Sequence, residues 1–246
     1  IGAAMGCTGT DVTRQAASMI LADDNFSTIV AAVEEGRNIY NNIRKFIRYL
    51  LSCNIGEVLT MFLGMLLGMP IPLLPAQILL VNLVTDGLPA IALSMESGDK
   101  SVMKKKPRDP DEHIFADGLW QLIVTRGIII GVSTLLSFII VFRQSGSLEL
   151  ARTAALVTLV LNQLIHVFEC KSEEKSIFRI PILSNLWLVA AVFISLAVLV
   201  AVIYIPALQS LFRTVALLAE QWIIVTLLSF LPPVISSFFK RRSKEG

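Results

Sequence analysis

From residue 49 to its end, the chain alternates between long apolar runs and short polar segments. Each run has about 20 mostly apolar residues, the length that an α-helix needs to cross a bilayer. The pattern predicts six transmembrane helices, at about residues 49–68, 76–95, 119–142, 151–168, 186–205 and 222–239. We therefore expect a mainly α fold, a polytopic helical membrane bundle whose surroundings are the lipid bilayer.

The composition agrees with a membrane protein. Hydrophobic residues make up 54% of the 246 residues and charged residues 16%, whereas charged residues make up about 25% of soluble domains. The net charge of +2 gives no indication of nucleic-acid binding. The three cysteines have neither metal-ligand nor paired spacing, so we expect free thiols.

Residues 1–24 follow a different pattern. Two apolar runs of strand length, residues 1–5 and 18–22, flank a helix-forming stretch that begins with the capping residue Thr10. This order predicts a short remnant of an α/β domain. The chain starts at Ile1 without an initiator methionine or a signal peptide, which we interpret as the start of a fragment.

A stretch without proline follows, from Asn25 to Met69, and it predicts one long helix after an N-cap at Asp23 or Asp24. Charged and amide residues crowd residues 25–48, whereas Glu57 is the single charged residue of the first span. Residues 25–48 are therefore expected to form a stalk helix in the cytoplasm that continues into the membrane.

Lysine and arginine concentrate in one set of loops, while the opposite loops hold Arg143, Arg152 and Arg213. The positive-inside rule places the cation-rich loops in the cytoplasm, and six spans then place both chain ends there as well. The cations on this side are Arg37, Arg44, Lys45, Arg48, Lys100, Lys104, Lys105, Lys106, Arg108, Lys171, Lys175, Arg179, Lys240, Arg241, Arg242 and Lys244.

Polar residues interrupt the first two spans at positions deep in the membrane. Asn54 and Glu57 are three residues apart and share a helix face. Asn82, Thr85 and Asp86 share a face of the second span in the same way. The short turn between the spans lets both sets converge, and their oxygens suit a hard cation such as Ca²⁺. We predict a cation site here, because ionisable residues at membrane depth indicate function.

Gly56, Gly87 and Pro89 fit the same interpretation, because glycine and proline loosen a helix and free carbonyl groups where they line a cavity. The alternative is that the neutral amides and the hydroxyl of this set merely form hydrogen bonds between helices.

The fourth span carries another polar face, formed by Asn162, Gln163 and His166. Gln163 is a possible further ligand of the cation, and interhelical packing is the alternative. His166 and His113 have no partner in the sequence pattern, so we expect them to be solvated or to cap helices.

Two further patterns are weaker. Met61, Met65 and Met69 form a stripe that is expected to pack against other helices, with a path for a soft metal ion as the alternative. Thr8, Gly9 and Thr10 match the end of an aspartyl-phosphate motif, but no aspartate stands before them to act as nucleophile.

Seven short motifs carry a family resemblance. They are Ala4-Met5-Gly6, Ala22-Asp23-Asp24-Asn25-Phe26, Glu34-Glu35-Gly36-Arg37, Ile39-Tyr40-Asn41-Asn42, Phe46-Ile47-Arg48-Tyr49, Asn54-Ile55-Gly56-Glu57-Val58 and Val81-Asn82-Leu83-Val84-Thr85-Asp86-Gly87-Leu88-Pro89-Ala90. Together they resemble the C-terminal part of P-type calcium ATPases, most closely the sarco/endoplasmic reticulum class and its bacterial relatives. The resemblance is dense to about residue 110 and looser beyond it.

The resemblance implies that residues 1–24 close the phosphorylation domain and that the six spans are the fifth to tenth helices of a ten-helix membrane domain. The long helix would link the phosphorylation domain to the ion site, and the loop of residues 96–116 would contact that domain.

The resemblance also assigns ligands. It implies that Asn54 and Glu57 bind the ion from the fifth helix, and that Asn82, Thr85 and Asp86 bind it from the sixth. The register counted back from Arg179-Ile180-Pro181 places the family's eighth-helix carboxylate at Gln163, a neutral residue, which permits a single transported Ca²⁺.

By this resemblance, the chain is the membrane half of an ATP-driven Ca²⁺ pump with proton counter-transport. The phosphate-accepting aspartate and the sites for ATP and Mg²⁺ would lie upstream, so we expect no catalytic residue in this chain. The alternatives are a P-type pump for another cation, such as Mn²⁺, Na⁺/K⁺ or H⁺, and a truncated non-catalytic scaffold. We expect a multi-pass protein of a prokaryotic cell membrane.

Overall fold

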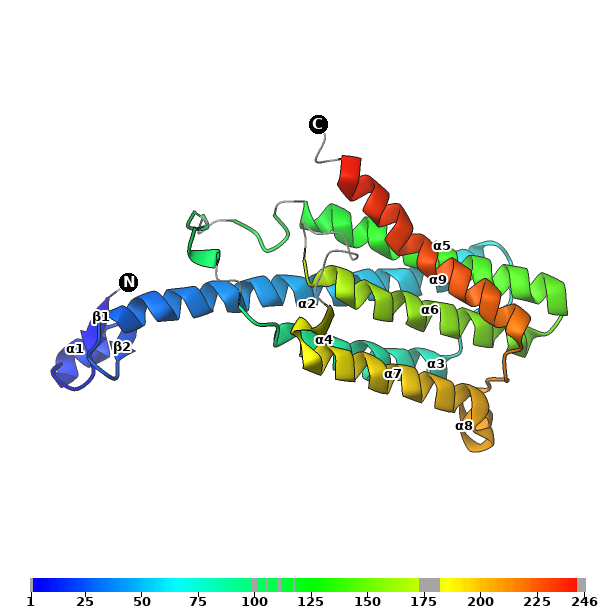
Figure 1. Ribbon diagram of the computed structural model, residues 1–246, viewed down its shortest axis with the longest axis horizontal. Helices are drawn as coiled ribbons and strands as arrows, with labels where there is room; N and C mark the ends of the chain where they lie inside the picture. The colour runs from blue at the N-terminus through cyan, green and yellow to red at the C-terminus, as the bar shows by residue number, and fades with distance from the viewer. Residues whose placement is uncertain are drawn as a thin grey trace. The chain divides into compact units, whose positions relative to one another are not determined.

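The computed structural model describes residues 2–98, 101–104, 106–109, 112–116, 118–172 and 182–242, and the side chains up to Val234. The chain divides into two compact units, residues 1–41 with 97–110 and residues 42–96 with 111–246 (Figure 1). Some residues used above for orientation and register lie outside the described residues, namely Ile1, Lys100, Lys105, Lys175, Arg179, Ile180, Pro181 and Lys244.

A parallel pair of strands begins the first unit. β1 (Ala3–Met5) pairs with β2 (Met19–Leu21), and α1 (Asp11–Ala16) connects them. The hydroxyl of Thr10 caps α1, as its position before the helix-forming residues predicted. The predicted order of strand, helix and strand is therefore observed.

Asp24 joins this segment to the turn after β1 instead of capping the long helix. Its carboxylate accepts the backbone N–H groups of Cys7 and Thr8, both at 2.8 Å. The N–H of Cys7 is the main reason that the pKa of Asp24 lies below its ordinary value. At the start of the helix, the Asn25 side chain accepts the N–H of Ser27 at 3.0 Å.

α2 (Ser27–Leu66) is an uninterrupted helix of 40 residues, close to the bounds expected from the proline-free stretch. Residues 27–41 belong to the first unit and the remainder to the second. Within the first unit, Arg37 donates a hydrogen bond of 3.1 Å to the carbonyl of Val102 in the short helix Val102–Lys104.

The second unit contains the other helices. They are α3 (Pro75–Leu80), the π-helical segment Val81–Asp86, α4 (Gly87–Ser94), α5 (Leu119–Ser145), α6 (Leu148–Cys170), the short helix Ile182–Ser184, α7 (Leu186–Tyr204), α8 (Pro206–Phe212) and α9 (Ala219–Arg242). Among the described residues, five helices are long and apolar enough to cross a membrane, with residues 75–94 counted as one. The sixth expected span corresponds to α9, whose described apolar part, Ala219–Val234, is shorter.

Glycine and capping residues set the turns between the spans. Gly68 follows α2 with φ of +65°, a conformation that glycine adopts without strain, and the proline-rich turn begins two residues later. Gly146 ends α5 with φ of +64°. The Ser147 hydroxyl then accepts the N–H of Leu150 and starts α6. Both turns make consecutive helices antiparallel, as expected for short connections.

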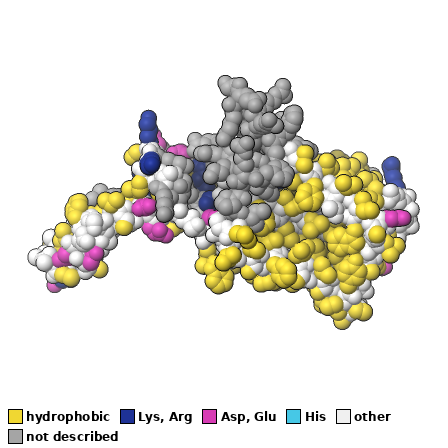
Figure 2. All heavy atoms as spheres, viewed as in Figure 1, with side chains coloured by type: hydrophobic (Ala, Val, Ile, Leu, Met, Phe, Trp, Pro, Cys, Tyr) yellow, Lys and Arg dark blue, Asp and Glu magenta, His cyan; other side chains and the backbone are white. Residues whose placement is uncertain are grey.

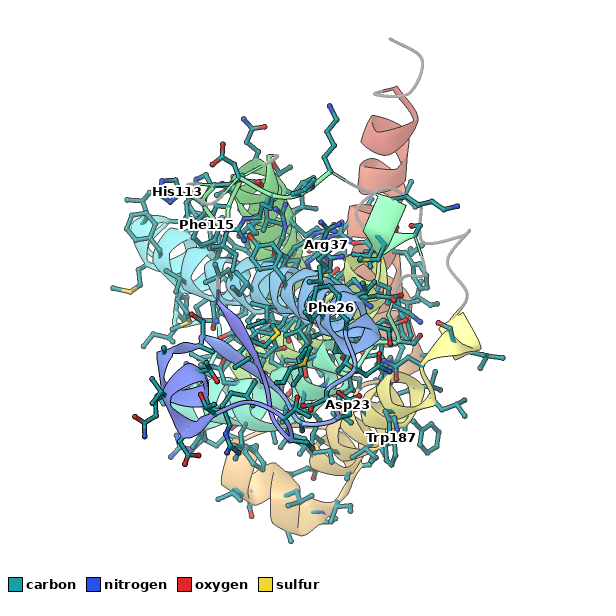
Figure 3. All side chains as sticks on the ribbon, turned by 90° about the vertical axis from the view of Figure 1, so that its left-hand side faces the viewer. Asp23, Phe26, Arg37, His113, Phe115 and Trp187 are labelled. Atoms are coloured by element: carbon teal, nitrogen blue, oxygen red, sulfur yellow. The ribbon has the colours of Figure 1, made fainter. Side chains whose placement is uncertain are left out.

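α6 is the central helix of the second unit. It packs against α5 and α9, while α4 packs against α7 (Figure 1). In its most apolar part, α6 has 83% of its residues buried, compared with 33% for α7. α7 therefore presents most of its surface outward. Figure 2 shows hydrophobic side chains over the visible face of these helices, and in Figure 3 Trp187 of α7 points away from its neighbours.

Three glycines allow α2 and α5 to pack closely. A Cβ atom on Gly127 would lie 2.4 Å from Cγ2 of Ile55, and one on Gly131 would lie 2.9 Å from the carbonyl oxygen of Gly56. Gly56 therefore serves close helix packing, and the prediction that it loosens the helix is wrong. The irregular backbone lies in the π-helical segment that ends just before Gly87.

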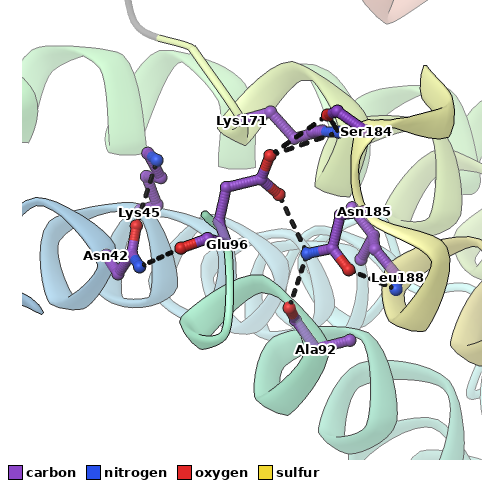
Figure 4. A network of polar contacts seen from close by, with 8 residues as sticks. All are labelled: Asn42, Lys45, Ala92, Glu96, Lys171, Ser184, Asn185 and Leu188. Carbon is purple, nitrogen blue, oxygen red and sulfur yellow. Dashed lines mark hydrogen bonds and ion pairs between the residues drawn. The ribbon is translucent and has the colours of Figure 1, made fainter. Parts of the chain in front are cut away.

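A polar network joins the ends of three helices near α4 (Figure 4). The Glu96 carboxylate, just beyond α4, pairs with Lys171 after α6 at 3.4 Å and accepts the Asn185 side chain before α7 at 2.9 Å. Asn185 also donates to the carbonyl of Ala92. On the other side, Asn42 of α2 donates to the carbonyl of Glu96 at 2.7 Å. These contacts fix the end of α4 to α2, α6 and α7.

Candidate cation site

Two carboxylates and one amide meet at the centre of the second unit. Glu57 comes from α2, Asp86 from the end of the π-helical segment and Gln163 from the middle of α6. The Gln163 amide nitrogen donates to Oε1 of Glu57 at 2.9 Å and to Oδ2 of Asp86 at 3.2 Å. The exposed fractions of the three residues are 4%, 1% and 0%, so the carboxylates lie in a largely dry environment.

Two further side chains complete the group. The Asn82 amide donates to Oε2 of Glu57 at 3.3 Å, so both oxygens of that carboxylate are occupied. The Tyr49 hydroxyl lies 3.2 Å from Oδ1 of Asp86 and donates toward it. Amide and hydroxyl donors therefore surround both carboxylates.

The π-helical segment Val81–Asp86 explains how Asp86 reaches the group. Such segments interrupt the regular hydrogen-bond ladder of an α-helix and often occur at functional sites. Side chains from neighbouring helices bind the carbonyl groups here. Ser195 of α7 donates to the carbonyl of Val84 at 3.3 Å, and the Tyr49 hydroxyl, whose one proton is shared with Asp86, lies 3.3 Å from the carbonyl of Thr85. Backbone of this kind is tolerated at membrane depth when protein groups satisfy it.

The structure brings together four of the six residues considered from the sequence, namely Glu57, Asn82, Asp86 and Gln163. Thr85 lies beside them, but its hydroxyl donates to the carbonyl of Val81 at 2.9 Å in its own helix. Asn54 is exposed on α2 and makes no hydrogen bond within the described residues.

Tyr49 and Ser195 are parts of this site that sequence reasoning missed. Tyr49 stands at the start of the first predicted span and Ser195 inside the apolar fifth span. The hydroxyl of Ser195 is a weak signal because serine is common between membrane helices. The Tyr49 hydroxyl can be assigned to the site only from the folded structure, which places it beside Asp86.

The charge of the site is unbalanced. Within the described residues, no lysine, arginine or histidine pairs with Glu57 or Asp86, and no group of three His, Cys, Asp or Glu side chains is placed to hold a metal ion. Buried carboxylates need a counter-charge or protons. Two carboxylates and neutral oxygen donors suit a hard cation, with further ligands still required for the six to eight that Ca²⁺ takes.

His166 is buried and has several partners, so the expectation of a solvated or capping residue is wrong. Its Nδ1 atom lies 3.1 Å from Nε of Arg126 and 3.1 Å from Oε2 of Glu169, and Arg126 also pairs with Glu169. His113, by contrast, is exposed (Figure 3), which agrees with a solvated loop residue.

The methionine stripe is divided by the fold. Met61 and Met69 pack against the hydrophobic core, whereas Met65 is 67% exposed. The three sulfur atoms therefore do not share one environment, and the packing interpretation is the one that fits Met61 and Met69.

The described helices form a bundle typical of membrane proteins, with two buried carboxylates that no cationic side chain of the described residues pairs with. A family model described as "Cation transporting ATPase, C-terminus" matches residues 70–242. The chain belongs to this family.

Individual relatives agree with this assignment. The chain is 54% identical to a calcium-transporting ATPase of Bacillus subtilis, covering 94% of the chain and 26% of that protein. It is 44% identical to calcium-transporting ATPase 1 of Bacillus cereus, covering 99% of the chain and 29% of that protein. It is 40% identical to the endoplasmic reticulum calcium ATPase srcA of Aspergillus fumigatus, covering 96% of the chain and 27% of that protein. The chain thus spans about a quarter of the length of these relatives.

Proposed function

We propose that this chain is the membrane part of an ATP-driven pump whose transported substrate is Ca²⁺. The observation that carries the proposal is that Glu57, Asp86 and Gln163 meet where the described part of the chain offers no lysine, arginine or histidine as a counter-charge. The names of the relatives support Ca²⁺ as the ion. Carboxylate and amide oxygens are also the ligands that this hard cation prefers.

In this proposal, Gln163 holds the carboxylates together when no ion is bound. Its nitrogen contacts both of them, and its buried Oε1 atom has no hydrogen-bond partner. Rotation of the amide would turn Oε1 toward an arriving ion and release both carboxylates to bind it. When the ion leaves, protons would neutralise Glu57 and Asp86, which gives proton counter-transport.

The remaining ligands would come from Asn54, Asn82, Thr85 and an upstream part of the protein. Asn54 is exposed on α2 in the described chain, so another helix could cover it and complete the site. Gln163 is neutral, and the two carboxylates balance the charge of one Ca²⁺. We therefore propose that one Ca²⁺ is carried per cycle.

The wider architecture follows from the same proposal. Residues 1–24 would close a phosphorylation domain, residues 25–48 would form the cytoplasmic stalk and residues 49–246 the transmembrane domain. ATP and Mg²⁺ would bind to upstream domains. Both ends of the chain would lie in the cytoplasm, and the protein would reside in a prokaryotic cell membrane.

The test is ATP-dependent uptake of ⁴⁵Ca²⁺ into vesicles that contain the full-length protein. We expect Asp86→Asn to reduce uptake to the level measured without ATP, because it removes one of two charged ligands. Glu149→Gln is the matched control, since Glu149 is an exposed carboxylate of α6 far along the helix from Gln163, and we expect normal uptake.

Competition by Mn²⁺ and Na⁺ in the same assay addresses the other cations. Normal uptake by Asp86→Asn would contradict the proposed site. Transport of Mn²⁺ or Na⁺ without Ca²⁺ would show a pump for another ion. Absence of ATP-dependent transport of any of these ions would support a scaffold without pump activity.

A further inference from the structure

A second group of buried charges lies between α5 and α6 and has no part in the proposed transport site. Arg126, His166 and Glu169 are exposed by 5%, 0% and 4% respectively. The Nε atom of Arg126 donates to Nδ1 of His166 at 3.1 Å, and its Nη2 atom donates to Oε2 of Glu169. One guanidinium edge therefore binds both neighbours. We call these three residues the arginine trio.

The ring nitrogen Nδ1 of His166 lies between a donor and an acceptor. The Arg126 guanidinium can only donate to it, whereas the Glu169 carboxylate, also 3.1 Å away, can only accept from it. The other ring nitrogen, Nε2, lies 3.4 Å from the Cys170 sulfur. Arg126 and Glu169 form an ion pair beside the imidazole. The three side chains therefore hold one another in place between α5 and α6.

The trio is linked to the carboxylate site through Tyr49. The Tyr49 ring is completely buried, and its centroid lies 6.1 Å from that of the His166 ring at an interplanar angle of 34°. Its hydroxyl contacts Oδ1 of Asp86 and the carbonyl of Thr85. His166 thus forms part of the wall that sets where the tyrosine ring can lie.

The position of His166 depends on the two charged residues. The guanidinium edge holds the imidazole in one orientation, because the hydrogen bonds of Arg126 to a nitrogen and to an oxygen have fixed geometry. Arg126 itself precedes Gly127, where α5 packs tightly against α2. The trio therefore connects three elements of the site, namely α5, α6 and the tyrosine of α2.

We propose that His166 is a positioning residue for the cation site. The arginine trio holds its imidazole against the Tyr49 ring, and this contact keeps the tyrosine hydroxyl on Asp86 and sets the affinity for the ion. The inference rests on the proposed function, because it assumes that Asp86 binds the transported ion.

The test is a double-mutant cycle in the full-length protein, read out as the Ca²⁺ concentration that gives half-maximal ATP-dependent uptake. Tyr49→Phe removes the hydroxyl, and we expect about a tenfold rise in this concentration, because a hydrogen bond to a charged group is lost. His166→Phe disrupts the trio, and we expect about a threefold rise, because the tyrosine can then leave its position. The double variant should be no weaker than Tyr49→Phe alone.

Several controls separate positioning from other roles. His113→Phe changes an exposed histidine and should leave half-saturation unchanged. If His166→Phe does not give monodisperse protein, His166→Asn enters the same cycle, since it keeps an acceptor for Arg126 without the ring. A merely structural role would lower the yield and the maximal rate without moving half-saturation, and this result would overturn the inference.

Other outcomes are equally decisive. Independent effects that multiply to about thirtyfold in the double variant would show that His166 does not act through Tyr49. A changed pH profile at constant half-saturation would indicate proton transfer in place of positioning. Asp86→Asn, measured in parallel, distinguishes failure of the positioning role from failure of the proposed function. Normal uptake in that variant would contradict the proposed function itself.

Discussion

Two groups of buried charged residues in the same helical unit differ in one respect. In the arginine trio, Glu169 has Arg126 as its counter-charge. In the carboxylate site, Glu57 and Asp86 have neutral donors and, within the described part of the chain, no cation. Both groups are shielded from solvent. The first has a cation beside its carboxylate, whereas the second needs an ion or protons.

The difference shows how to separate structural from functional charge in a membrane protein. A buried carboxylate that pairs with a guanidinium group has its charge neutralised by the fold. A buried carboxylate that accepts hydrogen bonds from amides and hydroxyls is held in position, but no cationic side chain neutralises its charge. The second arrangement can exchange counter-charges, which a transport site must do.

The largest expected effect is a loss of stability when the ion pair of the arginine trio is broken. Arg126→Leu removes the guanidinium group that pairs with the buried Glu169 carboxylate, and we expect a loss of about 3 to 5 kcal/mol in stability. Thermal unfolding of the full-length protein in detergent measures this change. Arg143→Leu, an exposed arginine of the same helix, is the control and should have little effect. Replacing both Arg126 and Glu169 with leucine should restore most of the stability, and equal losses in the single and double variants would contradict the assignment.

At the carboxylate site, removal of a charge is expected to leave stability unchanged or to raise it slightly. Without Ca²⁺, Glu57→Gln removes a negative charge beside Asp86, so the unfolding temperature should stay constant or rise slightly. Addition of Ca²⁺ should stabilise the normal protein by an amount that grows with concentration, and this gain should disappear in Glu57→Gln. Glu149→Gln should keep the gain. A large loss of stability in ion-free Glu57→Gln would mean that this carboxylate is structural.

The smallest effect concerns Asp24, a partly exposed carboxylate that accepts two backbone N–H groups. Because the N–H of Cys7 holds the pKa of folded Asp24 below its unfolded value, Asp24 contributes stability above about pH 3.9. This contribution is lost as the pH falls through the folded pKa. Hydrogen exchange of residues 2–24 in the full-length protein, corrected for intrinsic rates, should therefore show protection that falls in acid.

Two variants check the Asp24 prediction. Asp24→Asn should show reduced protection already at neutral pH, since an amide accepts these hydrogen bonds less strongly than a carboxylate. Asp11→Asn removes a surface ion pair with Arg14 and should behave like the normal protein. Identical acid profiles for the normal protein and Asp24→Asn would contradict the role of Asp24.

Much of the fold could be predicted from local pattern. The absence of proline from Asn25 to Met69 predicted α2 to within a few residues, because nothing interrupts its hydrogen-bond ladder. The strand, helix and strand at the start followed from short apolar runs and the cap at Thr10. Apolar length predicted the spans, because a helix that crosses hydrocarbon needs about 20 apolar residues whatever its neighbours are.

The candidate site could be predicted in part. Glu57 and Asp86 stand out as carboxylates in apolar runs, and helical spacing connected them with Asn82. Regular spacing could not show the π-helical segment that carries Asp86, because its hydrogen bonds depend on Ser195 and Tyr49 from other helices. Spacing also could not show that the Thr85 hydroxyl donates to the carbonyl of Val81 in its own helix, and its role as a ligand stays a prediction.

The sequence by itself determined which residues belong to helices long and apolar enough to cross a membrane, because hydrophobicity acts residue by residue along the chain. Only the tertiary structure decided which of these residues meet. Gln163 became the bridge between two carboxylates, and His166 became the partner of Arg126, because α6 lies at the centre of the bundle. Counter-charge is a property of neighbours in space, and so the distinction between a structural charge and a free one appears only in the folded chain.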